Sequence, residues 1–235
     1  MTYIAATLLA AGLALLGVVV PFVGNHLNVA IAAIFLYAPA VAGRIVGHPF
    51  DYREAGLRLD PIGLNLRVLS VALAITFPLF ALAFFMFYGY VCGPRGGSLA
   101  SMFPALCPHW LGLAGGALRL PAGFLTSALN QLIVVAIPEE IFFRGYLMEK
   151  LDRRWAPSER RRVVLGAPVG KALLVSSLLF AVGHVVVVPN PQRLAVFFPA
   201  LLFGWMRART GSIMSGAIFH ALCNLFADLL HTSYF

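Results

Sequence analysis

The chain has 235 residues, of which 60% are apolar and 11% charged, and its formal net charge is +8. A soluble domain carries roughly 25% charged residues, so this composition excludes a soluble enzyme, a disordered tail and a coiled coil. The long apolar runs instead predict a membrane protein with several spans. In such proteins a basic excess usually lies in cytoplasmic loops, so the positive charge does not indicate nucleic-acid binding.

Seven stretches of the chain are candidate membrane spans, because a helix that crosses a bilayer needs about 20 mostly apolar residues. We therefore expect an all-α membrane bundle of about seven helices. The segment 98–120 is apolar but interrupted by prolines and glycines, so we interpret it as an outer or re-entrant loop. An eighth span at this position is the alternative. The seven predicted spans cover about 3–22, 26–47, 67–91, 123–148, 170–188, 192–207 and 212–230.

The basic residues predict how the chain is oriented in the membrane. The segments 43–67, 149–171 and 207–211 hold four, seven and two of the 17 Lys and Arg residues. Seven spans place these three segments on one side, which the positive-inside rule assigns to the cytoplasm. The N-terminus is then expected in the cytoplasm. The abundance of alanine and arginine favours a bacterial inner (plasma) membrane.

The regions outside the spans carry further expectations. Cys92 and Cys107 would share the oxidising side, where two free thiols are the favoured interpretation and a disulfide is the alternative. The arginine-rich stretch 153–162 is interpreted as a solvated loop against anionic lipid head groups. We divide the single membrane domain into N-terminal helices with an outer loop, 1–120, and a helical core, 121–235.

Acidic residues within the predicted spans are functional candidates, because a charge at the bilayer centre costs about 2.5–3.5 kcal/mol. Glu140 and Arg144 are four residues apart, so they share a helix face and are expected to pair. Glu139 points about 100° away and remains available for chemistry. Pro138 is expected to open or kink this helix. The alternative is that both glutamates only hold helices together. Asp228 is interpreted as a residue of the outer interface, and a supporting role behind the site is its alternative.

Two of the six histidines, His184 and His220, also fall within predicted spans. Asn224 follows His220 by four residues and therefore lies on the same helix face. Counted from the nearest cytoplasmic flank at about 1.5 Å per residue, Glu139, His184 and His220 all lie about 15–20 Å deep. This agreement predicts a single polar site within the membrane.

These side chains are sufficient to hydrolyse an amide bond without a covalent intermediate. A carboxylate beside an imidazole can take a proton from water, and a histidine N–H and an asparagine amide can donate to an oxyanion. The chain contains no GxSxG nucleophile motif. Zinc held by Glu139, His184 and His220 is the alternative. Because no HExxH pair is present, we prefer water activation by Glu139 and expect no metal cofactor.

Three motifs at these positions resemble the CPBP family, the CAAX-type and bacteriocin-processing (Abi-type) intramembrane endopeptidases. The resemblance covers about 121–230. It implies that Glu139 is the catalytic base, that His184 assists it, and that His220 and Asn224 stabilise the oxyanion. It also implies that no metal takes part. The motifs are EExxxR at Glu139, Glu140 and Arg144, FxxxH at Phe180 and His184, and HxxxN at His220 and Asn224.

The resemblance further implies that Glu140, Arg144 and Phe180 support the site, and that the substrate is a membrane-associated protein or peptide. Tails or anchors at the C-termini of exported proteins are one substrate class. Two other functions remain open at this point. One is a non-catalytic membrane adaptor or immunity protein on the same fold. The other is an ion-coupled transporter, although the inverted repeats expected of one are not found. The oligomeric state is left open.

Overall fold

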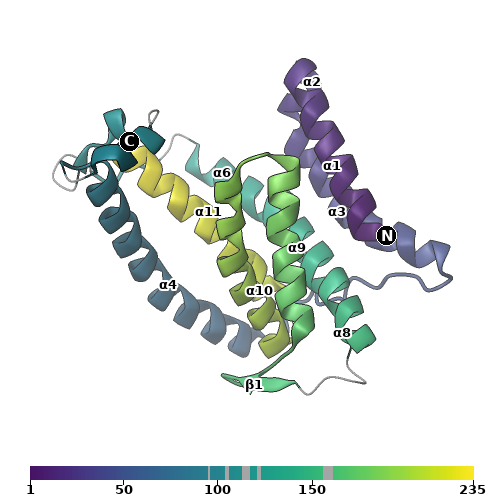
Figure 1. Ribbon diagram of the computed structural model, residues 1–235. Coiled ribbons are helices and arrows are strands. Elements are labelled where there is room, and N and C mark those ends of the chain that lie inside the picture. The colour runs from purple at the N-terminus through teal and green to yellow at the C-terminus, as the bar shows by residue number, and fades with distance from the viewer. Residues whose placement is uncertain (95, 104–105, 113–116, 121–122, 156–160) are drawn as a thin grey trace.

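The computed structural model describes the chain except for residues 95, 104–105, 113–116, 121–122 and 156–160. Figure 1 shows a helical bundle in which α1 to α3 form one flank, α4 forms the other, and α9, α10 and α11 lie between them. This arrangement confirms the expected all-α membrane bundle. A two-stranded antiparallel hairpin, β1 (Arg162–Val164) and β2 (Ala167–Val169), is the addition that the sequence did not indicate.

The N-terminal helices pack against the core from two sides. Helix α1 contacts α3 and α9, whereas α4 contacts α11 on the opposite flank. Pro21 begins α2, where its missing N–H would have no helical partner in any case. These helices are α1 (Thr2–Val19), α2 (Pro21–Asn25), α3 (Leu27–Ile45) and α4 (Ile62–Val91).

The helix that carries the EExxxR motif is continuous from Phe124 to Trp155, and two of its stretches are π-helical. Pro138 lies in the short α segment between them. The helix is therefore widened on both sides of the proline and not broken at it, and such π-helical turns are frequent at functional sites. Its parts are α6 (Phe124–Asn130), η3 (Gln131–Ala136), α7 (Ile137–Glu140), η4 (Ile141–Met148) and α8 (Glu149–Trp155).

Three further helices complete the core. Helix α9 (Lys171–Val187) is followed by a 3-10 helix, η6 (Pro191–Val196), which leads into α10 (Phe197–Thr210). The last helix, α11 (Met214–Tyr234), contacts α10, α4 and η3. The side chains of the EExxxR helix thus lie within reach of both α9 and α11.

Helices occupy all seven predicted spans, but the count of seven membrane crossings is not confirmed. Within the described residues, four helices are long and apolar enough to cross a membrane: α1, α3, α4 and the continuous helix Phe124–Trp155. Helix α9 is shorter, with 17 residues. The predicted span 192–207 is divided between η6 and α10, and α11 carries several polar side chains.

The segment after α4 folds back on itself. The described part of 98–120 holds two 3-10 helices, η1 (Gly97–Met102) and η2 (Cys107–His109), and no helix long enough to cross a membrane. The turn brings the Cα atoms of Cys92 and Cys107 to 4.9 Å, and the two residues form a disulfide. The interpretation of these cysteines as free thiols is therefore wrong.

The arginine-rich stretch is only partly described, because 156–160 lie outside the described residues. Arg161 forms an ion pair with Asp152 at 2.8 Å, and Arg162 begins the exposed strand β1. The hairpin is attached to the core because the indole nitrogen of Trp205 donates to the carbonyl of Val164.

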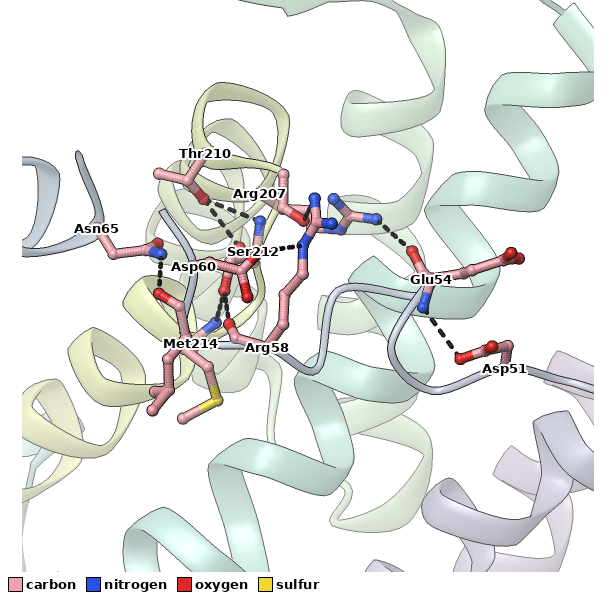
Figure 2. Close-up of polar contacts among 11 residues, drawn as sticks. Asp51, Glu54, Arg58, Asp60, Asn65, Arg207, Thr210, Ser212 and Met214 are labelled. Carbon is pink, nitrogen blue, oxygen red and sulfur yellow. Dashed lines mark hydrogen bonds and ion pairs between the residues drawn. The ribbon is translucent and has the colours of Figure 1, made fainter. Parts of the chain in front are cut away.

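The loop between α3 and α4 is fixed to the turn between α10 and α11 (Figure 2). The amide of Ile213 donates to the carbonyl of Gly56 at 2.9 Å, and the guanidinium of Arg58 donates to the carbonyl of Gly211 at 3.2 Å. The hydroxyl of Ser212 donates to the carbonyl of Arg58. These bonds connect residues more than 150 positions apart in the chain, so the N-terminal helices and the core form one unit at this end.

We expect Gly56→Ala to destabilise the protein more than Gly47→Ala does. Both glycines have a positive φ, which costs a residue with a side chain about 1–2 kcal/mol. A Cβ at Gly56 would in addition lie 2.9 Å from Nε of Arg207 and 3.2 Å from the amide of Ile213, whereas one at Gly47 would meet nothing within 4 Å. The extra crowding is expected to cost about 1–3 kcal/mol. Thermal unfolding in detergent measures both variants, and equal losses would contradict the described contact.

Candidate active site

The residues of the three motifs meet at a cavity of about 420 Å³ between the helices. Glu139, Phe180 and His184 line it together with His220 and Asn224. Glu140 and Arg144 lie behind this lining and are fully buried. The structure therefore brings together all seven residues that the sequence analysis selected, in two layers. Asp228, in contrast, is exposed and does not line the cavity.

Glu139 faces the two histidines across short gaps. Its Oε2 atom lies 4.0 Å from Nε2 of His184 and 3.8 Å from Nε2 of His220. Both distances exceed the 2.7–3.2 Å that is typical of an N–H···O hydrogen bond. The side chain of Glu139 is 13% exposed and lines the cavity, although its Oε2 atom is buried and has no hydrogen-bond partner among the described residues.

The orientation of His184 follows from its backbone contact. Its Nδ1 atom lies 2.9 Å from the carbonyl oxygen of Phe180. A carbonyl oxygen can only accept, so Nδ1 carries the hydrogen and donates it. In the neutral ring, Nε2 is then an acceptor that faces Glu139. Two acceptors, Oε2 of Glu139 and Nε2 of His184, thus face each other.

Glu140 and Arg144 form a completely buried ion pair, as their spacing predicts. Oε2 of Glu140 lies 3.3 Å from Nε of Arg144, and both side chains are 0% exposed. Oε1 of Glu140 lies 3.4 Å from Nδ1 of His220. His220 is therefore held between two carboxylates, with Glu140 on one ring nitrogen and Glu139 on the other.

Aromatic rings surround the guanidinium of Arg144. The ring of Phe180 lies 4.6 Å from it and the ring of Phe203 lies 5.5 Å from it, within the range of cation–π attraction. The Nη2 atom of Arg144 also donates to the carbonyl of Ala200 at 3.2 Å. Phe203 in turn stacks on His220 at 4.7 Å. The rings therefore restrict both Arg144 and the imidazole that faces Glu139.

Asn224 has a partner that the sequence analysis did not select. Its Nδ2 atom donates to Oε1 of Gln131 at 2.9 Å, and Gln131 also lines the cavity. The amide nitrogen of Asn224 keeps a second hydrogen for another acceptor. A glutamine inside the apolar run 123–148 was the available signal, but nothing in the sequence relates it to a residue 93 positions away.

The described residues contain no group of three or more His, Cys, Asp and Glu side chains arranged to hold a metal ion. Glu139, His184 and His220 are nevertheless close to one another. Glu140 contacts Nδ1 of His220 and the Phe180 carbonyl accepts from Nδ1 of His184, so both Nε2 atoms are left to face the cavity. The Nε2 atoms and the Glu139 carboxylate are the groups that face the cavity. Their chemistry suits a bound water, and it is also that of the zinc ligand set named as the alternative.

One family model matches the part of the chain that forms this site. Residues 121–226 match the family model described as type II CAAX prenyl endopeptidase Rce1-like. The matched segment contains every motif residue named above, and it confirms the resemblance to CAAX-type endopeptidases for this part of the chain. The apolar helices indicate an integral membrane protein, and its segment 121–226 is similar to an endopeptidase family. The comparisons with curated proteins and with solved structures gave no match.

We expect Arg144→Met to cost about 3–5 kcal/mol of folding free energy, because it leaves the buried Glu140 without its ion-pair partner. Arg153→Met is the matched control. Arg153 also pairs with a glutamate four residues earlier, Glu149 at 3.1 Å, but its side chain is 74% exposed. An exposed pair at this spacing contributes only about 0.3–0.5 kcal/mol. Thermal unfolding of both purified variants measures the difference, and similar midpoints would show that the buried pair is not needed for stability.

Proposed function

We propose that the chain is an intramembrane endopeptidase in which Glu139 activates the water that attacks a peptide bond. The observation that carries the proposal is the position of the Glu139 carboxylate. It lies on a cavity wall inside the helical bundle, opposite the Nε2 atoms of two histidines. The family match of residues 121–226 supports the general class of reaction.

Oε2 of Glu139 is buried and has no hydrogen-bond partner among the described residues, and in this scheme one water molecule bridges it to Nε2 of His184. Two acceptors separated by 4.0 Å can each accept one hydrogen from a water whose oxygen lies about 2.8 Å from both. A water held in this way presents its lone pair to a substrate carbonyl. As the water oxygen bonds to the carbonyl carbon, the proton that it loses passes to Glu139. Glu139 is the general base in this scheme, and His184 orients the water.

The negative charge on the former carbonyl oxygen needs donors. Asn224 offers its second Nδ2 hydrogen, and Gln131 fixes the direction of that amide. His220 in its doubly protonated form offers Nε2–H and remains paired with Glu140 through Nδ1–H. In that form the charges of Glu139, Glu140, Arg144 and His220 sum to zero, which limits the cost of burying them. Such prearranged donors contribute much of the rate in acyl transfer.

The second step breaks the carbon–nitrogen bond. The proton held by Glu139 passes to the departing amine, and the carbonyl reforms as a carboxylic acid. The carboxylate of Glu139 is then regenerated, so one water is consumed and no covalent intermediate is required. The reaction uses only groups that face the cavity.

The cavity wall suggests a membrane-associated polypeptide as the substrate. Apart from the polar groups already named, it is lined largely by apolar side chains, including Ile31, Phe35, Val135 and Val187. Its volume of about 420 Å³ is within the usual range for a small binding pocket, roughly 300–1,000 Å³. A short, extended, apolar peptide segment fits such a space.

We expect Glu139→Gln to abolish processing while the protein still folds, because the amide has nearly the same shape but cannot accept the proton. A general base typically contributes a factor of about 10²–10⁴. The measurement compares N- and C-terminal peptides of the membrane proteome by mass spectrometry in cells that carry either form. His184→Ala should give the same uncut termini.

Glu54→Gln is the matched control, since Glu54 is exposed and lies outside the cavity. It should process like the unmodified chain. If Glu139→Gln is inserted and expressed normally and no terminus changes, the chain is a binding or adaptor protein on the same fold, and the proposal fails.

Processing by purified protein should also persist in the presence of a zinc chelator, because the scheme needs no metal ion to activate the water. The measurement uses a substrate identified by the terminal-peptide comparison. Loss of cleavage with the chelator, followed by recovery on addition of Zn²⁺, would favour the alternative in which Glu139, His184 and His220 are metal ligands.

A further inference from the structure

The cavity that holds the candidate active site reaches the surface at one end of the helical bundle. Of its lining residues, three are exposed: Asn28 at the start of α3, Val188 just after α9, and Arg193 in η6. We call these three residues the mouth. They come from three separate segments, so the mouth is a property of this end of the bundle and not of one loop.

Buried aromatic rings close the other end of the cavity. Phe143, Phe180 and Phe203 all line it, and each is 2% exposed or less. Along their helices, Phe143 follows Glu139 and Phe180 precedes His184, which in each case is the direction away from the mouth. We call these three rings the floor. The buried Glu140–Arg144 pair lies beside them.

The basic segments lie at the floor end. Helix α9 begins at Lys171 and reaches the mouth 17 residues later, about 25 Å along the helix axis. Helix α3 begins at the mouth and ends with Arg44 in its last turn. The helix that carries Glu139 runs on to Arg153 and Arg154 in its last turn. Figure 1 shows α8 and the β1 hairpin together at this end, opposite the end where α2 lies.

The distribution of Lys and Arg residues therefore assigns the two ends of the bundle to different sides of the membrane. Thirteen of the 17 Lys and Arg residues belong to the three segments 43–67, 149–171 and 207–211, and the described ones among them lie at the floor end. Among the described residues, Arg119 and Arg193 are the basic residues of the other end. By the positive-inside rule the floor end is cytoplasmic. The mouth is then on the opposite side of the membrane.

The disulfide gives the same orientation on independent grounds. Cys92 directly follows α4, which begins after the loop 51–61 at the floor end and ends at the mouth end. Its partner Cys107 lies near the end of α11, because the amide of Leu111 donates to the carbonyl of Tyr234. Disulfides persist in oxidising compartments such as the periplasm and are rare in the cytosol.

We propose that the candidate active site is open to the extracytoplasmic side of the membrane and closed toward the cytoplasm. If the proposed function holds, on which this last step rests, the substrates are polypeptide segments of exported, membrane-associated proteins that lie next to the outer leaflet. A segment enters past Asn28, Val188 and Arg193 and reaches Glu139 without crossing the membrane. Cytoplasmic polypeptides are excluded by the floor.

The test measures access from each side of the membrane with thiol reagents. Arg193→Cys places a thiol at the mouth, and Arg162→Cys places one at the exposed start of β1 at the floor end. Both are made in full-length protein that carries Cys223→Ala, so that the free cysteine of the described residues does not react. Right-side-out and inverted membrane vesicles are each treated with a membrane-impermeant maleimide.

We expect the Arg193→Cys protein to be labelled only in right-side-out vesicles and the Arg162→Cys protein only in inverted ones. Labelling in the reverse sense would overturn the proposal. The Cys223→Ala parent should not be labelled on either side, because Cys92 and Cys107 are bridged.

A second measurement tests access to the interior of the cavity, beyond the mouth. Cys223 lines the cavity beside Asn224, so in the otherwise unmodified chain it reports access to the site. A small charged methanethiosulfonate reagent should modify it faster in right-side-out vesicles than in inverted ones. Equally fast or faster modification in inverted vesicles would show that the floor is open, and the proposal would fail.

These readouts do not depend on proteolysis. If the labelling is as expected but Glu139→Gln changes no terminus, the proposed function fails and the direction of access is upheld. If cleavage depends on Glu139 but the mouth is labelled only from the inverted side, the proposed function is upheld and the direction of access is wrong.

Discussion

The buried pair of Glu140 and Arg144 is the interaction on which the rest of the site depends. Both side chains are fully excluded from solvent, so each needs partners of the opposite charge or with a matching dipole. Those partners come from other helices: Phe180 from α9, Ala200 from α10 and His220 from α11. Apolar residues of similar volume can often replace such a pair without loss of stability. The pair therefore makes most sense as the contact that fixes the position of His220 opposite Glu139.

Two adjacent glutamates of identical chemistry occupy different environments. Glu140 points into the protein and contacts Arg144 and His220, whereas Glu139 is 13% exposed and faces the cavity. The rotation of about 100° between successive helical residues is sufficient to separate the two environments. One carboxylate can thus be held as a fixed charge while its neighbour remains available for proton transfer.

Local spacing in the sequence predicted the features that depend on a single helix. The pairing of Glu140 with Arg144 and the common depth of Glu139, His184 and His220 follow from helical geometry alone. Contacts between separate segments could not be derived in this way, because they depend on which segments become neighbours. The bond between Asn224 and Gln131, the attachment of Gly56 to Ile213 and the disulfide between Cys92 and Cys107 are of this kind. The motif roles remain predictions, because geometry places the residues without testing their chemistry.

The two π-helical stretches around Pro138 limit how this part of the gene can vary. A π turn contains more residues than an α turn, so η3 and η4 each hold length that an ordinary helix would not accommodate. Removing one residue from η3 would allow that stretch to return to α-helical geometry with almost no change of phase, because a π turn holds about one residue more than an α turn. Glu139 would then keep its direction, whereas a deletion within the α segment Ile137–Glu140 would rotate everything after it by about 100°. Homologues are therefore expected to differ in length, if at all, within η3 or η4 and not within Ile137–Glu140.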